Sequence, residues 1–179
     1  MLLEVKNLNK KFGSVTAANN INFKMNKNEI IGVIGANGAG KTTFCNIITG
    51  YLKADSGVIL YEGKNITKFN VQEIKNIGIH RSFQIPQVFE NLGVVENIII
   101  TELVAKNKQN SFFEDAYSKK NYQNAIKLLE KFSFDVDKFK DKTVKELPQG
   151  ARKVLDILIA IIGKPKVILL DEPTSGIST

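Results

Sequence analysis

Residues 35–43 read Gly-Ala-Asn-Gly-Ala-Gly-Lys-Thr-Thr, and this stretch decides the fold. It fits the pattern GxxxxGK[ST], in which glycines let the backbone turn inward so that successive N–H groups surround phosphate oxygens. Lys41 is placed to reach the β and γ phosphates of a nucleotide, and Thr42 to offer its hydroxyl to Mg²⁺. The residues expected to bind the nucleotide here are Gly35, Asn37, Gly38, Ala39, Gly40, Lys41, Thr42 and Thr43.

The sequence on either side of this loop separates a phosphate site from an ordinary glycine-rich turn with an exposed lysine. The segment before it, EIIGVIG (29–35), is a β-branched apolar run that predicts a strand. The segment after it, TTFCNIITG (42–50), predicts a helix that ends at Gly50, with the positive end of its dipole near Gly40. Strand, loop and helix in this order are what the phosphate-binding mechanism requires.

A second chemical signal is the segment KVILLDE (166–172), a continuous apolar run that ends in two acids. It predicts a fully buried parallel strand, and parallel strands deliver ligand-binding groups at their carboxyl ends. Asp171 would then hold Mg²⁺ through water, and Glu172 would polarise a water for attack on the γ phosphate. The alternative is that the two acids only mark the start of a loop, and the phosphate loop upstream favours the catalytic interpretation.

The rest of the chain predicts an α/β protein with helices inserted between two central strands. From about residue 92 to 162, apolar residues recur at every third and fourth position, which is the helical period. Outside that region we expect strands at 2–8, 15–24, 58–63 and 77–84 and a short helix near 71–77. The first two strands are separated by the turn-like KKFGS, residues 10–14.

The composition is that of an ordinary globular domain, with 43% hydrophobic and 24% charged residues. No apolar run approaches the roughly 20 residues that span a bilayer, and the N-terminus lacks a secretory pattern, so we expect a cytoplasmic protein. The single cysteine, Cys45, offers neither a disulfide nor a zinc site. The net charge of +7 comes from lysines scattered among acids, which favours a solvated surface over a nucleic-acid interface.

Four segments in order, GANGAGKTT, RSFQ, ELPQGARKVLDI and ILLDEPTSG, resemble the nucleotide-binding subunit of ATP-binding cassette (ABC) transporters over essentially the whole chain. The wording of KTTFCNIITGYLKADSGVILYEGKNIT and HRSFQIPQVFENLGVVENI looks most like the ATPases of branched-chain amino acid importers. The resemblance implies an α/β P-loop NTPase of ABC type, with a mixed or parallel sheet core, N-terminal antiparallel strands and an inserted helical subdomain. Residues 1–91 would form the first part of the ATPase core, 92–162 the helical subdomain and 163–179 the return to the core.

The resemblance also assigns residues that local patterns leave open. Phe12 would stack on the adenine, although an aromatic wedged between strands is the alternative. Gln84 would contact Mg²⁺ and the attacking water, while its loop meets a membrane partner; His80, just before that loop, is expected to be structural. The expected catalytic residues are thus Lys41, Gln84 and Glu172, and the expected metal-binding residues are Thr42, Gln84 and Asp171.

In this family two subunits face head to tail, and each ATP lies between the phosphate loop of one and the LSGGQ helix start of the other. Residues 147–151 read LPQGA in those positions, so Pro148, Gln149 and Gly150 would direct helix amides at a γ phosphate bound to a second copy. Pro148 replaces the serine of the family pattern, Ala151 its glutamine, and Ser178 a usual aspartate. We expect these changes to weaken contact with the transition state.

The resemblance therefore implies a subunit that binds ATP and Mg²⁺ and hydrolyses ATP to power an importer of branched-chain or related amino acids. Its implied partners are a second ABC ATPase subunit, identical or different, and membrane permease subunits contacted by the Gln84 loop and the helical subdomain. It would be cytoplasmic and peripheral on the inner face of the cell membrane, with no direct nucleic-acid contact. Two alternatives are a soluble ABC ATPase acting on nucleic acid or ribosomes, and a regulatory module that holds ATP without hydrolysing it.

The sequence ends at Thr179, whereas the family pattern continues with a further strand, a switch histidine and C-terminal helices. We therefore expect a fragment or a truncated gene product. Such a piece is expected to bind nucleotide at best and to hydrolyse it poorly.

Overall fold

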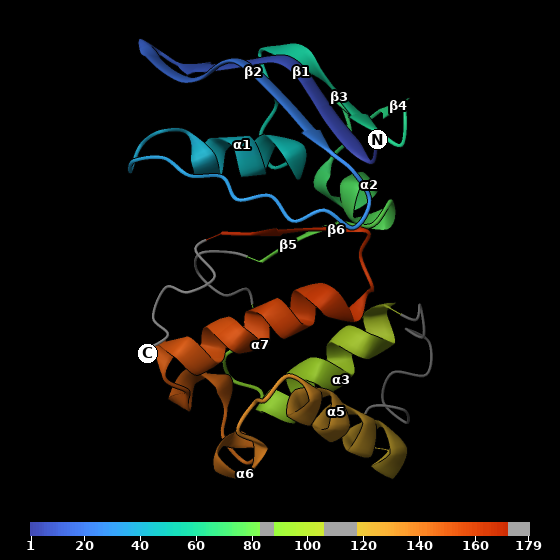
Figure 1. Ribbon diagram of the computed structural model, residues 1–179. Coiled ribbons are helices and arrows are strands. Elements are labelled where there is room, and N and C mark those ends of the chain that lie inside the picture. The colour runs from blue at the N-terminus through green and yellow to red at the C-terminus, as the bar shows by residue number, and fades with distance from the viewer. Residues whose placement is uncertain (83–87, 106–117, 172–179) are drawn as a thin grey trace. The chain divides into compact units, whose positions relative to one another are not determined.

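The computed structural model describes residues 1–82, 88–105 and 118–171 (Figure 1). Its contacts divide the chain into two compact units, residues 1–79 and residues 80–179. Three residues singled out in the sequence, Gln84, Glu172 and Ser178, lie outside the described residues. Over the described ranges, no helix has the length and apolar character needed to cross a membrane.

The first unit is built on an antiparallel sheet with the strand order β2-β1-β3-β4 (Figure 1). The strands expected in this unit around residues 2–8, 15–24 and 58–63 are confirmed. The first of them runs on to Phe12, so the turn is shorter than the predicted KKFGS. The strands are β1 (Leu3–Phe12), β2 (Val15–Met25), β3 (Ser56–Tyr61) and β4 (Lys64–Asn65).

Three apolar residues of β1, Leu3, Val5 and Leu8, reach the core because the strand contains a bulge. Leu3 and Val5 alternate onto one face, as residues two apart in a strand must. A register shift between Val5 and Leu8, with Asn7 at φ 49°, then brings Leu8 to the buried side as well.

Two helices pack in the first unit, as expected from the sequence. They are α1 (Lys41–Ile48) and α2 (Val71–Asn76). α1 buries Phe44, whose ring meets that of Phe23 in β2 edge to face with centroids 5.4 Å apart. α2 begins with a capping box, in which Asn70 and Glu73 satisfy each other's backbone N–H groups.

The strand expected at 29–35 is absent from the described part of the chain, so that prediction is wrong. The segment joins no described sheet, and its apolar side chains are uncovered, since Ile30 is 100% exposed and Ile34 98%. A β-branched run favours strand backbone, but a strand forms only where a neighbour completes its hydrogen bonds. The sequence of the segment does not supply that neighbour.

The second unit combines a two-stranded parallel sheet, β5 (Ile79–Ser82) with β6 (Val167–Leu170), and a group of helices. The helices fall between residues 92 and 162, where the helical period predicted them. They are α3 (Val94–Ala105), α5 (Lys119–Lys131), α6 (Val136–Phe139), the 3₁₀ helix η2 (Val144–Glu146) and α7 (Gln149–Ile162). Their apolar sides share one core, whose fully buried members include Val94, Ile98, Leu129, Val144 and Leu155.

Strand β6 is less buried than its apolar sequence predicted. Val167 is buried, Ile168 and Leu169 are half-buried, and Leu170 is 41% exposed. Among the described residues, β5 is the only strand paired with β6, so the sheet here is narrow. Full burial of a parallel strand needs a wider sheet that is covered on both faces.

Asp55 fastens the end of β1 to the chain just before β3. Its Oδ1 accepts a hydrogen bond from Lys10 Nζ at 2.7 Å, and its Oδ2 accepts one from the Lys11 backbone N–H at 2.7 Å. The bond from the Lys10 side chain, followed by that from Lys11, holds the pKa of Asp55 below its ordinary value.

We expect Asp55→Asn to remove a pH-dependent part of the stability. A carboxyl whose pKa is lower in the folded than in the unfolded chain stabilises the fold above its unfolded pKa of about 3.9, and loses this contribution as the pH falls through its folded pKa. The difference in unfolding free energy between wild type and variant should therefore be constant near neutrality and shrink below about pH 4. Urea titrations from acid to neutral pH measure it, and a difference independent of pH would contradict the assignment.

We expect Gly57→Ala to destabilise the first unit more than Gly63→Ala. Both glycines have positive φ, 105° and 81°, but a Cβ on Gly57 would lie 2.7 Å from backbone atoms of Asn7 and Leu8, whereas nothing lies within 4 Å of one on Gly63. The control should cost about 1 kcal/mol for the left-handed backbone, and Gly57→Ala a further ~1–3 kcal/mol. Urea unfolding at neutral pH measures both, and equal losses would show that the sheet yields at the bulge.

Candidate functional site

The phosphate loop of the first unit is folded around its own lysine. Lys41 Nζ donates hydrogen bonds to the carbonyl oxygens of Gly35 at 2.6 Å and Ala36 at 2.9 Å. The loop also closes a turn in which the Ala39 N–H donates to the Ala36 carbonyl oxygen at 3.1 Å. Because α1 begins at Lys41, the ammonium and the N–H groups of a helix start belong to one loop, which is an anion-binding arrangement.

Two glycines give this loop its path. Gly38 and Gly40 have φ of 82° and 87°, a region that residues with a Cβ rarely adopt. At Gly40 there is also no room, because a Cβ would lie 2.1 Å from the carbonyl oxygen of Ala17 in β2. The loop therefore rests directly on β2, and this close approach adds a second reason for glycine at position 40.

Phe12 lies at the end of β1, opposite Val15 at the start of β2. Its side chain is 49% exposed, so the alternative of an aromatic wedged between strands does not hold. Lys10 Nζ lies 5.5 Å from the ring centroid. Ala17, two residues after Val15 in β2, lies against Gly40 of the phosphate loop. The Phe12 ring is therefore on the same β1–β2 hairpin that supports the loop.

Asp171, in the second unit, follows directly after β6, and it is held by two cations. Its Oδ2 accepts a hydrogen bond from Arg81 Nη2 at 2.7 Å, and its backbone carbonyl oxygen accepts one from Lys153 Nζ at 2.8 Å. Arg81 lies in β5 and Lys153 in α7. The sequence analysis missed both contacts, because neither strand β5 nor helix α7 marks its charged residue by a local pattern.

The start of α7 carries the residues expected to act on a second copy. Pro148 is the N-cap, with φ −63° and ψ 155°, and the helix begins at Gln149. Pro148 and Gln149 are exposed and Gly150 is half-buried, so the first turn is accessible. Residues 150–162 are all buried or half-buried, so the helix behind the exposed start is anchored.

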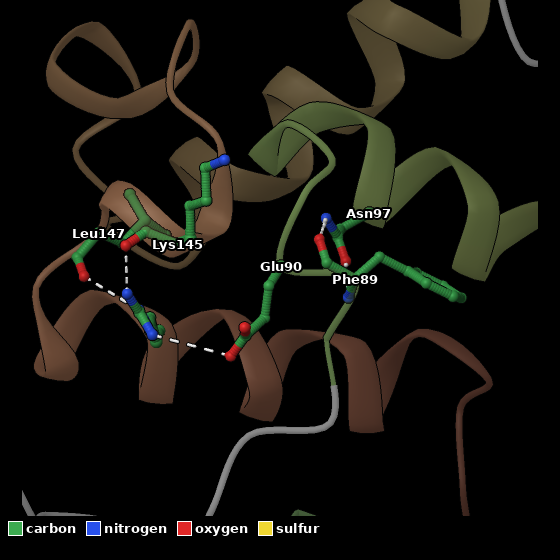
Figure 2. A network of polar contacts seen from close by, with 6 residues as sticks. Phe89, Glu90, Asn97, Lys145 and Leu147 are labelled. Carbon is green, nitrogen blue, oxygen red and sulfur yellow. Dashed lines mark hydrogen bonds and ion pairs between the residues drawn. The ribbon is translucent and has the colours of Figure 1, made fainter.

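A network of polar contacts fixes the chain just before this helix start (Figure 2). Arg152, in the first turn of α7, donates to the carbonyl oxygens of Leu147, at 3.0 Å, and Lys145. Its guanidinium also lies 3.9 Å from the carboxylate of Glu90. In addition, the Lys145 backbone N–H donates to the Glu90 carbonyl oxygen at 3.0 Å.

The other side of the network is organised by Asn97 of α3, which is fully buried (Figure 2). Its amide accepts a hydrogen bond from the Phe89 N–H at 2.9 Å and donates to the carbonyl oxygens of Phe89 and Gly93. Backbone hydrogen bonds then hold residues 89–94, which follow the Gln84 segment, against residues 142–147, which precede α7. Sequence patterns gave no indication of this pairing.

The expected site residues that the structure describes are divided between the two units. Phe12 and residues 35–43 belong to the first unit, and Asp171 and residues 148–150 belong to the second. Gln84 and Glu172 are outside the described residues, so their roles remain predictions. His80 Nδ1 lies 2.9 Å from the carbonyl oxygen of Ala160 in α7, in keeping with a structural role.

Comparisons with known proteins identify the family of the chain. Residues 18–175 match the ABC transporter family model. A probable branched-chain amino acid transport ATP-binding protein of Methanocaldococcus jannaschii is 35% identical over 99% of this chain and 70% of its own length. A xylose/arabinose import ATP-binding protein of Sulfolobus acidocaldarius is 32% identical over 99% of this chain and 68% of its own length.

Solved structures agree as well. A nucleotide-free ATP-binding cassette from an ABC transporter has a TM-score of 0.79 and 34% identity, over 99% of this chain and 71% of that one. A dimeric cassette bound to ADP and phosphate has a TM-score of 0.82 and 23% identity, over 99% and 77%, which compares the fold alone. The expected α/β P-loop fold, with antiparallel and parallel sheets, is confirmed. The chain belongs to the ATP-binding cassette ATPases of ABC transporters.

Proposed function

We propose that this chain binds ATP with Mg²⁺ and, paired with a second cassette, hydrolyses it to drive import through membrane permease subunits. The observation that carries the proposal is the loop of residues 35–41 folded around Lys41, with α1 starting at its end. Members of the family bind and hydrolyse ATP in general. We assign branched-chain or related amino acids as the transported class.

In this proposal Lys41 exchanges partners when ATP binds. Its ammonium, bonded to the carbonyl oxygens of Gly35 and Ala36, would donate to phosphate oxygens instead. The loop N–H groups and the start of α1 would take the remaining phosphate charge. Phe12, half-exposed on the supporting hairpin, would stack on the adenine.

Thr42 and Asp171 would hold Mg²⁺, since both offer oxygen ligands of the kind that this ion prefers. Phosphate oxygens and water would complete the shell, as is usual for this ion at nucleotide sites. When bound, Mg²⁺ neutralises charge on the phosphates during transfer. Glu172 would orient and polarise the attacking water, and Gln84 would contact that water and the metal.

A second cassette would complete the site. Pro148, Gln149 and Gly150 would present the first-turn amides of α7 to the γ phosphate of the partner's ATP. The exposed start and anchored remainder of α7 support this role, and a related cassette is dimeric with ADP and phosphate. Pro148 offers no hydroxyl, so we expect a contact weaker by about 1–3 kcal/mol than one including such a bond.

Permease subunits would be contacted by the Gln84 loop and by the helical segment 92–162. The backbone hydrogen bonds between residues 89–94 and 142–147 support this proposal, because they link the chain after Gln84 to the chain before α7. A force on the Gln84 loop would then reach the helix start that contacts ATP. The cassette would lie on the cytoplasmic face of the membrane.

The transported class rests on the names of the relatives. The relative at 35% identity is named as a branched-chain amino acid transport protein, while a xylose/arabinose import ATPase is only slightly less similar at 32%. The changed LPQGA start favours one other function, a regulatory module that holds ATP without hydrolysing it. Turnover of the assembled complex separates the two.

We expect Lys41→Ala to weaken ATP binding about 10- to 100-fold, because it removes a charge-assisted hydrogen bond worth ~1.5–3 kcal/mol. Titration with a fluorescent ATP analogue measures the Kd. The control is Lys24→Ala. Lys24 belongs to the same unit as Lys41, and its side chain is 66% exposed. Equal Kd values for wild type and Lys41→Ala would refute the phosphate site.

We expect Glu172→Gln to retain ATP binding and to lose about 10²- to 10⁴-fold in turnover, since the amide cannot accept a proton from water. The assay uses the ATPase copurified with its permease subunits. Turnover that is equally absent from wild type and variant would favour the regulatory module. Copurification with ribosomes or nucleic acid in place of membrane subunits would contradict a transport role.

A further inference from the structure

We propose that Arg81 limits the strength with which the site holds Mg²⁺. It acts as the resident counter-ion of Asp171, and the metal has to share that carboxylate with it. This inference rests on the proposed function, because it concerns the Mg²⁺ that accompanies ATP. It adds a positioning residue that neither the sequence patterns nor the predicted metal ligands include.

The geometry of the pair is specific. Arg81 Nη2 and Asp171 Oδ2 are 2.7 Å apart, and they come from neighbouring strands of the two-stranded sheet, β5 and the end of β6. The contact occupies Oδ2, one of the two carboxylate oxygens. A planar guanidinium also fixes the orientation of a carboxylate, which a lysine ammonium does less well.

Burial makes this ion pair effective. The Arg81 side chain is 4% exposed and that of Asp171 is 9% exposed, so water and salt screen their interaction only weakly. Lys153, itself 3% exposed, bonds the backbone carbonyl oxygen of Asp171. That second contact leaves the main chain of Asp171 anchored when Arg81 is changed.

A cation beside a metal ligand has a predictable effect on the metal. It cancels part of the carboxylate charge and repels the incoming Mg²⁺, so the second unit alone offers a poor metal site. If ATP binds as proposed above, the negative charge of its triphosphate would offset this repulsion. The affinity of the site for Mg²⁺ would then depend on the nucleotide.

A purely structural role would have a different signature. If Arg81 only joined β5 to β6, its replacement would lower the stability of the second unit and leave the preference for metal-bound nucleotide unchanged. The informative quantity is thus the Kd for ATP in EDTA divided by the Kd for ATP in saturating Mg²⁺. By thermodynamic linkage this ratio reports how much the protein favours the metal.

The experiment measures this ratio for the 179-residue chain and three variants. Arg81→Met, which removes the charge and keeps the buried stem, should raise the ratio about 10-fold, within the range by which residues around metal ligands alter affinity. Arg81→Lys, which keeps the charge, should stay within about 2-fold of wild type. Lys131→Met, at an exposed site in α5, is the matched control and should leave the ratio unchanged.

An unchanged or lower ratio in folded Arg81→Met would overturn the proposal. An equal rise in Arg81→Lys would also overturn it, because the charge would then be irrelevant. Should Arg81→Met not fold, as judged by circular dichroism, Arg81→Gln carries the same test, and misfolding of both would show that the residue serves the fold. If the wild-type chain bound ATP in neither condition, the proposed function itself would fail.

Discussion

A loop that is to bind a triphosphate anion needs many hydrogen-bond donors in fixed positions, and this requirement explains the path of the phosphate loop. Main-chain N–H groups can do this only where the chain turns with positive φ, and Gly38 and Gly40 allow that turn. The close contact of Gly40 with Ala17 transfers the rigidity of the antiparallel sheet to the loop. Lys41 supplies the one full charge of the loop, and its ammonium is held at the loop carbonyls.

The second unit also carries groups that are expected to meet phosphate and metal. In the proposed function the start of α7 would offer backbone donors to phosphate, and Asp171 would offer one carboxylate to a metal. Both are anchored through α7, because Arg152 fixes the carbonyl groups before the helix and Lys153 fixes the chain at Asp171. One helix therefore connects the surface expected to meet a partner with the residue expected to meet Mg²⁺.

The sequence predicted the features that depend on residues close together in the chain. The phosphate loop, α1, α3 and α7 follow from glycine spacing and the helical period, and the structure has them. The expected strand at 29–35 and the expected full burial of β6 depend on neighbours from elsewhere in the chain, so the sequence could not settle them. The partners of Asp171 are likewise invisible locally, since Arg81 is separated from it by 90 positions. The positions of the expected catalytic residues Gln84 and Glu172 rest on resemblance.

The uncovered run around Ile30 and Ile34 has a consequence for handling the protein. Apolar β-branched segments outside any sheet are templates on which other chains add strands, and this segment carries two almost completely exposed isoleucines. Its only charge, Glu29, stands at one end, so little electrostatic repulsion protects it. The purified chain should therefore self-associate as its concentration rises, and dilute solutions, or a chaperone that binds such segments, would preserve the monomer.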